Sequence, residues 1–194
     1  MTDALTHRQI DRQRALRRAL AAAFATLVCG LTLAAPEVVV GVEKPGEAFV
    51  VDARFALIVP LRTAWEVLTD YDHMSTILSN LATSQITQRS GNTLFVTQEG
   101  NARYGLFSYP FTSDREIRLE PMQRIVATQL KGTAKRFTST TELDHAGNIT
   151  RLHYHAEIVP GSGIGRIFGG PFIEHEVEEQ LHALADEMQR RSGP

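Results

Sequence analysis

The sequence predicts an α+β fold in which a curved antiparallel sheet of seven strands wraps around a long C-terminal helix, with two short helices after the first strand. Short segments of alternating apolar and polar residues fill the middle of the chain, and turn residues separate them. Only the last stretch has a long helical pattern. This order of elements favours a meandering sheet over parallel β-α-β units.

The expected domain begins with a strand over residues 47–59. Phe49, Val51 and Phe55 share one face of it, as expected for a strand half-buried against a core. Pro60 ends the strand because proline cannot donate a hydrogen bond to a neighbouring strand. The other six strands are expected at residues 84–89, 93–98, 107–120, 124–131, 136–143 and 149–159.

The stretch TAWEVLTDYDHMSTILSNL, residues 63–81, starts as an amphipathic helix and breaks at a polar group, residues 70–73. One interpretation is two short surface helices joined by a turn. The other is a helix pair that closes the mouth of a hydrophobic cavity. A twisted sheet curls and must have its concave face covered, and side chains rarely fill such a space completely, so the sequence favours the cavity.

A long amphipathic helix is expected after a glycine-rich stretch at residues 161–170. Pro171 suits its first turn. Its apolar positions recur at spacings of three and four: Ile173, Val177, Leu181, Leu184 and Met188. Its acidic residues are expected mostly on the other face, near the N-terminus, where the helix dipole favours negative charge: Glu174, Glu176, Glu178 and Glu179. This helix is expected to lie across the concave face of the sheet.

The N-terminal residues 1–35 are expected to be a secretory signal peptide. Arginines at positions 12, 14, 17 and 18 precede an uncharged, alanine-rich run from Ala19 to Ala35. This layout predicts export to the periplasm. The alternative is a retained membrane anchor, although a run of about 17 residues is at the lower limit for a span. Residues 36–46 would then form a linker and residues 47–191 the folded domain.

The composition is that of a globular chain with one domain. The chain has 194 residues, of which 43% are hydrophobic and 22% are charged, so it can bury a core. Its single cysteine, Cys29, excludes an intramolecular disulfide. Without residues 1–35 the formal net charge changes from −2 to −5. The remaining basic residues form no stripe, so no nucleic acid is expected as a partner.

Three residues in RLHYHAEIV have spacing that could suit a metal. His153, His155 and Glu157 fall on one face of a strand, and nitrogen and oxygen donors suit zinc or iron. However, Leu152 and Tyr154 alternate with them, which places the three on the solvated outer face of a one-sided sheet. We therefore expect neither a metal nor another cofactor.

Asp70, His73 and Tyr154 are the candidates for acid–base chemistry. A carboxylate and an imidazole beside an apolar mouth can have shifted pKa values and transfer protons near neutrality. The alternative for Asp70 and Asp72 is a structural role in capping or ending helices, which the sequence favours. No nucleophile motif or phosphate-binding loop accompanies these residues.

An apolar pocket is the more strongly indicated kind of site. Aromatic and aliphatic side chains with a few polar tips are what such a pocket needs. The candidates for binding a ligand are Trp65, Tyr71, Leu78, Phe107, Tyr109, Phe111, Tyr154, Phe168, Phe172, Ile173 and Val177. The alternative, that many of them only pack the core, stays open because residue parity does not distinguish a cavity wall from a closed core.

Four short segments carry a family resemblance: WEVLTDYD (65–72), ILSNLATS (77–84), VTQEG (96–100) and LKGT (130–133). In this order the chain resembles the polyketide cyclase/dehydrase and lipid-transport group of the START-like SRPBCC superfamily, in particular its coenzyme Q-binding branch. The resemblance implies a helix-grip fold with an internal tunnel for a ligand.

Two functions follow from the pocket and the resemblance. The first is non-catalytic binding or transport of a hydrophobic small molecule such as a lipid, isoprenoid, quinone or polyketide, with transient contact with a membrane. The second is a cyclase or dehydrase that acts on a hydrophobic substrate. The candidate acid–base residues gather at helix ends rather than along an inner strand face, which favours the first.

Overall fold

The structure is a computed structural model that describes residues 38–104, 107–161 and 169–193, with the backbone alone for Tyr104 and Phe107. The chain divides between Ala35 and Pro36, and the described residues belong to the second part. The expected signal segment, residues 1–35, lies outside them. No helix among the described residues is both long and apolar enough to cross a membrane.

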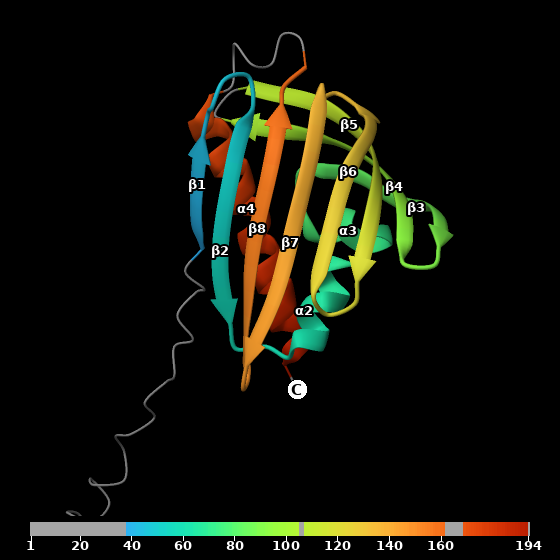
Figure 1. Cartoon of the computed structure of the whole chain (residues 1–194), viewed down its shortest axis with the longest axis vertical. Helices are drawn as coiled ribbons and strands as arrows, with labels where there is room; N and C mark the ends of the chain where they lie inside the picture. Colours follow the sequence, from blue (N-terminus) through green and yellow to red (C-terminus); the bar gives the residue numbers. More distant parts are fainter. Residues whose placement is uncertain (1–37, 105–106, 162–168, 194) are drawn as a thin grey trace, which may run out of the picture. The chain divides into compact units, whose positions relative to one another are not determined.

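One curved antiparallel sheet forms the frame of this part, as Figure 1 shows. Its eight strands lie in the order β1-β2-β8-β7-β6-β5-β4-β3. Their bounds are β1 Val39–Glu43, β2 Phe49–Leu57, β3 Leu81–Ser90, β4 Thr93–Tyr104, β5 Phe107–Glu120, β6 Arg124–Gly132, β7 Arg136–Ala146 and β8 Ile149–Val159. The predicted fold class is confirmed, with eight strands in place of the expected seven.

The additional strand is β1, which lies in the segment 36–46 that the sequence suggested to be a linker. It pairs antiparallel with β2, and Val42 stands opposite Val51. The sequence VVVGV at residues 38–42 suits an extended edge strand because β-branched side chains fit a pleated surface. The run is short and uniformly apolar. It therefore does not show the alternation of apolar and polar residues from which the other strands were predicted.

Buried residues alternate along β2 as the sequence predicts. Phe49, Val51 and Ala53 are almost completely buried, and Phe55 and Leu57 continue the same face. β2 pairs along its other edge with β8, and both strands contribute buried side chains to the core, with Phe55 of β2 opposite Leu152 of β8. The chain then leaves this edge and reaches β3 at the far edge of the sheet.

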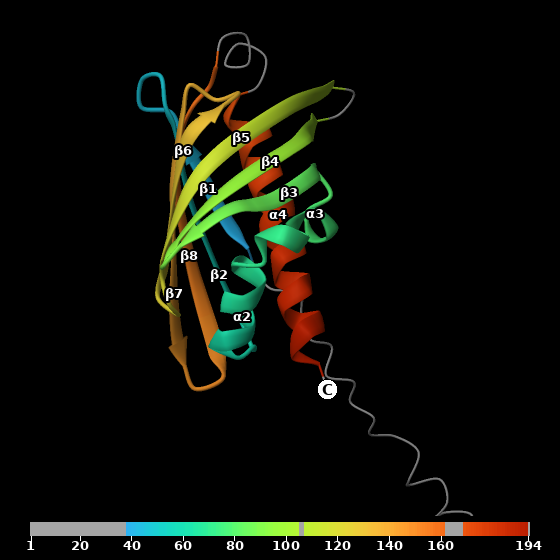
Figure 2. The same ribbon diagram turned by 90° about the vertical axis from the view of Figure 1, so that its right-hand side faces the viewer.

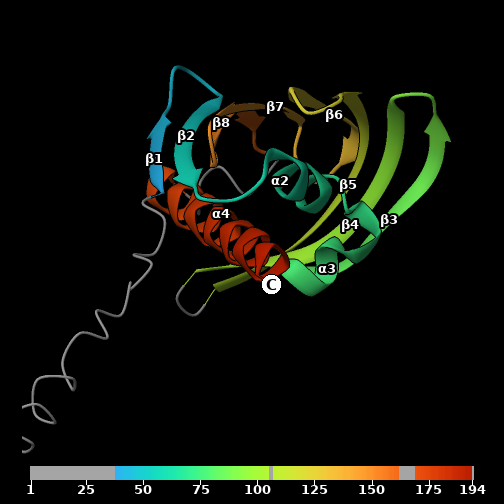
Figure 3. The same ribbon diagram turned by 90° about the horizontal axis from the view of Figure 1, so that it is seen from below.

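Helices make that crossing and cover the concave face. α2 (Leu61–Leu68), the 3-10 turn η1 (Tyr71–His73) and α3 (Met74–Ile77) connect β2 with β3, and α4 (Gly170–Ser192) ends the fold. Figures 2 and 3 show α4 lying across the concave side of the sheet, with α2 beside its C-terminal half. Its main neighbours are β1 and β2 on one side, and α2, α3 and β4 on the other.

The prediction that Asp70 and Asp72 cap or end helices is wrong for the capping alone: α2 ends at Leu68, just before them, but the break does not depend on side-chain caps. Neither η1 nor α3 has a capping hydrogen bond from a side chain. Asp72 instead accepts the backbone N–H of Ile86 in β3 at 2.7 Å. Asp70 binds Arg191 and His73, because charged partners bind a carboxylate more strongly than a neutral amide does.

Arg191 joins the end of α4 to the segment after α2. Its Nη2 donates to Asp70 Oδ2 at 2.8 Å, and its Nε donates to Glu187 Oε1 at 2.6 Å. Burial alone would raise the pKa of Asp70, but the hydrogen bonds from His73 and Arg191 outweigh it and lower that pKa. The hydrogen bond from Arg190 lowers the pKa of Glu187 to about 2 against the opposing effect of burial, and Arg191 adds to it.

This ion-pair network predicts a pH-dependent contribution to stability. Both carboxyl groups have a lowered pKa in the folded state, so the stabilisation is complete above their unfolded pKa values of about 4 and is lost as pH falls through the folded values. Arg191→Met should therefore lower the free energy of unfolding by about 1–2 kcal/mol at pH 7. The difference from the parent protein should shrink between pH 4 and pH 2.

Denaturant unfolding followed by the fluorescence of Trp65, the single tryptophan, measures this difference. Arg62→Met is the matched control, because Arg62 pairs with Glu66 on an exposed helix surface, where an ion pair contributes little, and the change should leave the stability nearly unaltered at pH 7 and at pH 2. A destabilisation by Arg191→Met that stays constant from pH 7 to pH 2 would contradict the assignment.

Candidate functional site

A cavity of about 370 Å³ lies between α4 and the inner face of the sheet. Its lining comes from α2, η1, α3, α4 and every strand except β1. α4 has its main neighbours at β1, β2 and β4, so the inner faces of β5, β6 and β7 are not packed directly under it. The volume is in the usual range for small-molecule sites. The helices after β2 therefore line a cavity, while their closing of its mouth stays a prediction.

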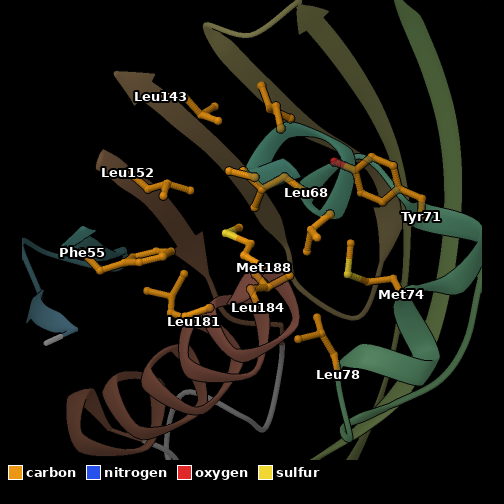
Figure 4. Close-up of a cluster of buried hydrophobic side chains, with 14 of the residues drawn as sticks. Phe55, Leu68, Tyr71, Met74, Leu78, Leu143, Leu152, Leu181, Leu184 and Met188 are labelled. Carbon is orange, nitrogen blue, oxygen red and sulfur yellow. The ribbon is translucent and has the colours of Figure 1, made fainter. Parts of the chain in front are cut away.

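One end of the cavity is apolar and close to a packed core. Figure 4 shows Leu68, Met74 and Leu78, from the segment after β2, converging with side chains of α4. Leu181 and Leu184 of α4 also line the cavity, whereas Met188 is completely buried one turn further on. The space is therefore closed by core packing near the C-terminal end of α4, and a ligand there would contact hydrocarbon.

The sheet side of the cavity is more polar, and Arg115 in β5 is the one cation among the described residues that line it. Arg115 shares the inner face of β5 with Phe111, four residues before it, and Ile117, two residues after it. Its Cζ lies 5.6 Å from the centre of the Phe137 ring, a cation–π contact. Its Nε is buried and has no hydrogen-bond partner.

Two tyrosines surround this guanidinium. Tyr71 comes from η1 and Tyr154 from β8, and both interact electrostatically with Arg115. Burial raises the pKa of Tyr71 to about 12, and burial also raises the pKa of Tyr154, whose phenol makes a hydrogen bond with Ser139. Both phenols are therefore protonated near neutral pH and can donate a hydrogen bond. Figure 4 shows the Tyr71 hydroxyl pointing inward from η1.

Glu176 is the single carboxylate among the described residues that line the cavity, and both of its oxygens accept hydrogen bonds from other parts of the protein. It accepts the Asn80 amide Nδ2 at 3.1 Å and the backbone N–H of Arg103 at 2.8 Å. The prediction that the acidic residues of this helix mostly face away is wrong for Glu176, which is 7% exposed. These two hydrogen bonds connect α4 to β4 and to the chain before β3, which compensates its burial.

The cavity contains most of the residues that the sequence suggested for ligand binding. Eight of them line it: Tyr71, Leu78, Tyr109, Phe111, Tyr154, Phe172, Ile173 and Val177. Trp65 lies outside the lining and packs against the core from α2, because it sits on the flank of the helix rather than on its inner face. The side chain of Phe107 and the whole of Phe168 lie outside the described residues.

The three candidates for acid–base chemistry do not come together. Tyr154 lines the cavity, but neither Asp70 nor His73 does. Asp70 is held by Arg191, and His73 Nδ1 lies 2.7 Å from Asp70 Oδ1 with most of its side chain exposed. These two residues belong to the surface contact between α4 and η1 rather than to the cavity.

The possible metal ligands of β8 lie on the outer face of the sheet. His153 Nε2 is 2.7 Å from Asp52 Oδ2, and Glu157 Oε2 is 3.8 Å from Arg136 Nη2. His155 Nδ1 is 3.8 Å from the same oxygen of Asp52. Within residues 38–104, 107–161 and 169–193, no three His, Cys, Asp or Glu side chains are arranged to hold a metal. That no metal binds stays a prediction.

Sequence reasoning missed the two charged residues that the described part of the chain contributes to the lining, Arg115 and Glu176. Arg115 lies an even number of residues from Phe111 and Ile117 on the same strand. This alternation could have shown that its side chain faces inward with theirs. Glu176 lies three residues after Ile173 and would have been recognised as inward-facing from helical spacing alone. Both were overlooked because a charged residue is normally assigned to the solvated face.

Comparisons with known proteins agree with this architecture. A family model described as polyketide cyclase/dehydrase and lipid transport matches residues 48–193. The chain therefore belongs to this family. None of the curated proteins matches it significantly.

Several solved structures share the fold at low sequence identity. TTHA0849 from Thermus thermophilus has a TM-score of 0.64 and 15% identity over 74% of this chain and 99% of its own. The Zhui aromatase/cyclase from Streptomyces sp. R1128 has a TM-score of 0.60 and 14% identity, covering 75% and 93%. A STAR-related lipid transfer protein from Xanthomonas axonopodis has a TM-score of 0.61 and 11% identity, covering 77% and 98%. These likenesses establish the fold, and they include both lipid-transfer proteins and cyclases.

Proposed function

We propose that this protein binds a hydrophobic small molecule in the cavity under α4 and carries it without changing it chemically. The observation that supports this most is the cavity itself: about 370 Å³, mostly apolar in its lining and bounded by α4. Apolar ligands gain binding free energy from leaving water, and a preformed cavity saves the cost of opening one. Lipids, isoprenoids, quinones and polyketide-like molecules are the classes that suit such a lining.

The distribution of proton-transfer groups favours a carrier over an enzyme. Both carboxylate oxygens of Glu176 already accept hydrogen bonds, and no histidine lines the cavity in the described part of the chain. Tyr154 and Tyr71 hold their protons near neutral pH because burial raises the pKa of each. The cavity therefore offers hydrogen-bond donors but no free general base.

A cyclase or dehydrase is the second proposal, and the group formed by Arg115, Tyr71 and Tyr154 is its support. A cation and two protonated phenols beside an apolar chain could stabilise an enolate as a carbonyl compound condenses. Turnover of a polyketide-like substrate that is lost in Tyr154→Phe while ligand affinity is kept would favour this second function.

We also propose that the chain is exported to the periplasm, with residues 1–35 removed. The support is the order of basic residues, apolar run and small residues at its start. N-terminal sequencing of the protein from the periplasmic fraction should give a chain that begins close to Pro36. Recovery of the intact chain, starting at Met1, in the membrane fraction would contradict the proposal and favour the anchor.

Val177 offers a way to separate a cavity wall from a closed core. It is half-buried and lines the cavity from α4, so a larger side chain there can extend into free volume. Val177→Phe should weaken binding of a neutral fluorescent lipophile such as N-phenyl-1-naphthylamine about tenfold or more while the melting temperature changes little. Ile173→Trp, which changes a more deeply buried residue of the same wall, should reduce binding and also cost stability.

The matched control is Ala185→Phe, two turns further along the same helix face. Ala185 is completely buried and does not line the cavity, so the larger side chain should overpack and cost about 1–3 kcal/mol. A clear fall in melting temperature with unchanged binding in Val177→Phe would mean that Val177 is core. Failure of the parent protein to bind any lipophile would remove the proposed function itself.

A further inference from the structure

The polar atoms that lack partners point to the kind of ligand that the cavity takes. Within the described residues, two buried side-chain nitrogen or oxygen atoms have no hydrogen-bond partner: Arg115 Nε and Asn80 Oδ1. Both belong to residues that line the cavity. A buried polar atom without a partner costs free energy, so such atoms in a cavity wall are expected to meet a ligand or water.

Arg115 carries the stronger signal because it is charged. A guanidinium keeps its proton in a protein, and a buried charge is costly unless an opposite charge accompanies it. Part of the side chain remains accessible, but protein atoms surround the guanidinium, and this burial lowers the pKa of Arg115. The phenols of Tyr71 and Tyr154 and the ring of Phe137 compensate only partly, since none of them is an anion near neutral pH.

No carboxylate of the described residues lies within ion-pair distance of Arg115, and the strand explains why. Asp114 and Glu116 flank it in sequence but point to the other face of β5. Asp114 accepts the Thr97 hydroxyl at 2.8 Å, and Glu116 pairs with Arg118 at 2.7 Å. Neither residues 105–106 nor residues 162–168 contain an acidic side chain that could reach it.

The sheet is irregular at this position. Asp114 stands opposite Lys131 while Arg115 stands opposite Gln129, so β6 has one extra residue beside Arg115. Bulges of this kind turn a side chain and are common beside functional sites. The Gln129 amide makes its hydrogen bonds elsewhere: its Oε1 accepts the Ser113 hydroxyl at 3.5 Å, and its Nε2 donates to the carbonyl of Ala134 at 2.8 Å. The guanidinium thus lies in the wall of the cavity with its Nε left without a hydrogen-bond partner.

We propose that the cavity selects amphiphiles with a single oxyanionic head group, which Arg115 binds while the hydrocarbon part lies along the apolar end near Leu181. Tyr71 and Tyr154 would donate further hydrogen bonds to the same head group. A carboxylate or a phosphate monoester has this chemistry, and both would form charge-assisted hydrogen bonds with the guanidinium. This inference rests on the proposed function, because it specifies the ligand of the same cavity.

The test compares three probes that share one twelve-carbon chain: dodecanoate, dodecyl phosphate and neutral dodecanol. Their affinities for the full chain are measured at pH 7 by displacement of N-phenyl-1-naphthylamine, so that all three report on one site. We expect at least one anionic probe to bind about tenfold or more tightly than dodecanol. Whichever anion binds more tightly identifies the head group as a carboxylate or a phosphate.

Variants of Arg115 then test whether this residue causes the preference for anionic probes. Arg115→Met keeps much of the side-chain volume without the charge, and should reduce the preference for the anion to about twofold or less while dodecanol binding is kept. Arg115→Lys keeps the charge and should retain part of the preference. The control is Arg118→Met on the same strand, because Arg118 is exposed and paired with Glu116, and it should change nothing.

The outcomes separate this inference from the proposed function. If all three probes bind equally to the parent protein, the inference is overturned while the cavity remains a binding site. If the anion preference persists in Arg115→Met, the charge is recognised elsewhere and the inference fails as well. If no probe binds at all, the proposed function fails with it. Should Arg115→Met not fold, the parent protein's preference and its retention in Arg115→Lys still decide the question.

Discussion

The architecture depends on how one straight helix is held across a strongly curved sheet. α4 has 23 residues, and its main neighbours are β1 and β2 at one edge, and α2, α3 and β4 at the other. Core packing fixes its C-terminal half through Ala185 and Met188, which have no exposed surface. Glu176 fixes its N-terminal half to β4 and Asn80. A helix held at these places cannot also follow the curvature of β5–β7, so a space remains beneath it.

That space explains the chemistry of its walls. Where α4 is close, the side chains are leucines and methionines that pack together, and a ligand there can only be apolar. Over the middle strands the walls are farther apart, and polar groups are tolerated because they face open volume: Ser113 and Arg115 on β5, Ser139 and Thr141 on β7, and Tyr154 on β8. The cavity is therefore amphipathic along its length, and Arg115, on the sheet side, is the one cation among the described residues that line it.

Much of this fold could be predicted from the sequence because its strands have one buried face. The period of two along β2 and the three-to-four spacing along α4 gave the elements, and the polar break at residues 70–73 gave the short helices. β1 was not predicted because its run of valines shows no alternation of apolar and polar residues. Its pairing with β2 is a contact that forms only in the folded chain. Residues such as Tyr71 and Val177 were correctly predicted to line the cavity, because aromatic and aliphatic side chains are typical of an apolar pocket.

The environments of the charged residues could be found only from the structure. Residue type suggests that Arg115, Asp70 and Glu176 all belong to the surface, yet each has a different environment. Asp70 is held by Arg191, a residue 121 positions away in sequence, and Glu176 by Asn80, 96 positions away. The Nε of Arg115 has no hydrogen-bond partner. Local patterns give the face of a strand or helix, but they do not show which distant groups meet there.

Native mass spectrometry can show whether the space under α4 holds one hydrophobic molecule. The protein is purified from its own host without detergent, and the same preparation is then exposed to a twelve-carbon amphiphile. We expect one bound lipophile per chain in at least one of these states, absent from Val177→Phe and released when the chain unfolds. The mass of the bare chain in both states would contradict it.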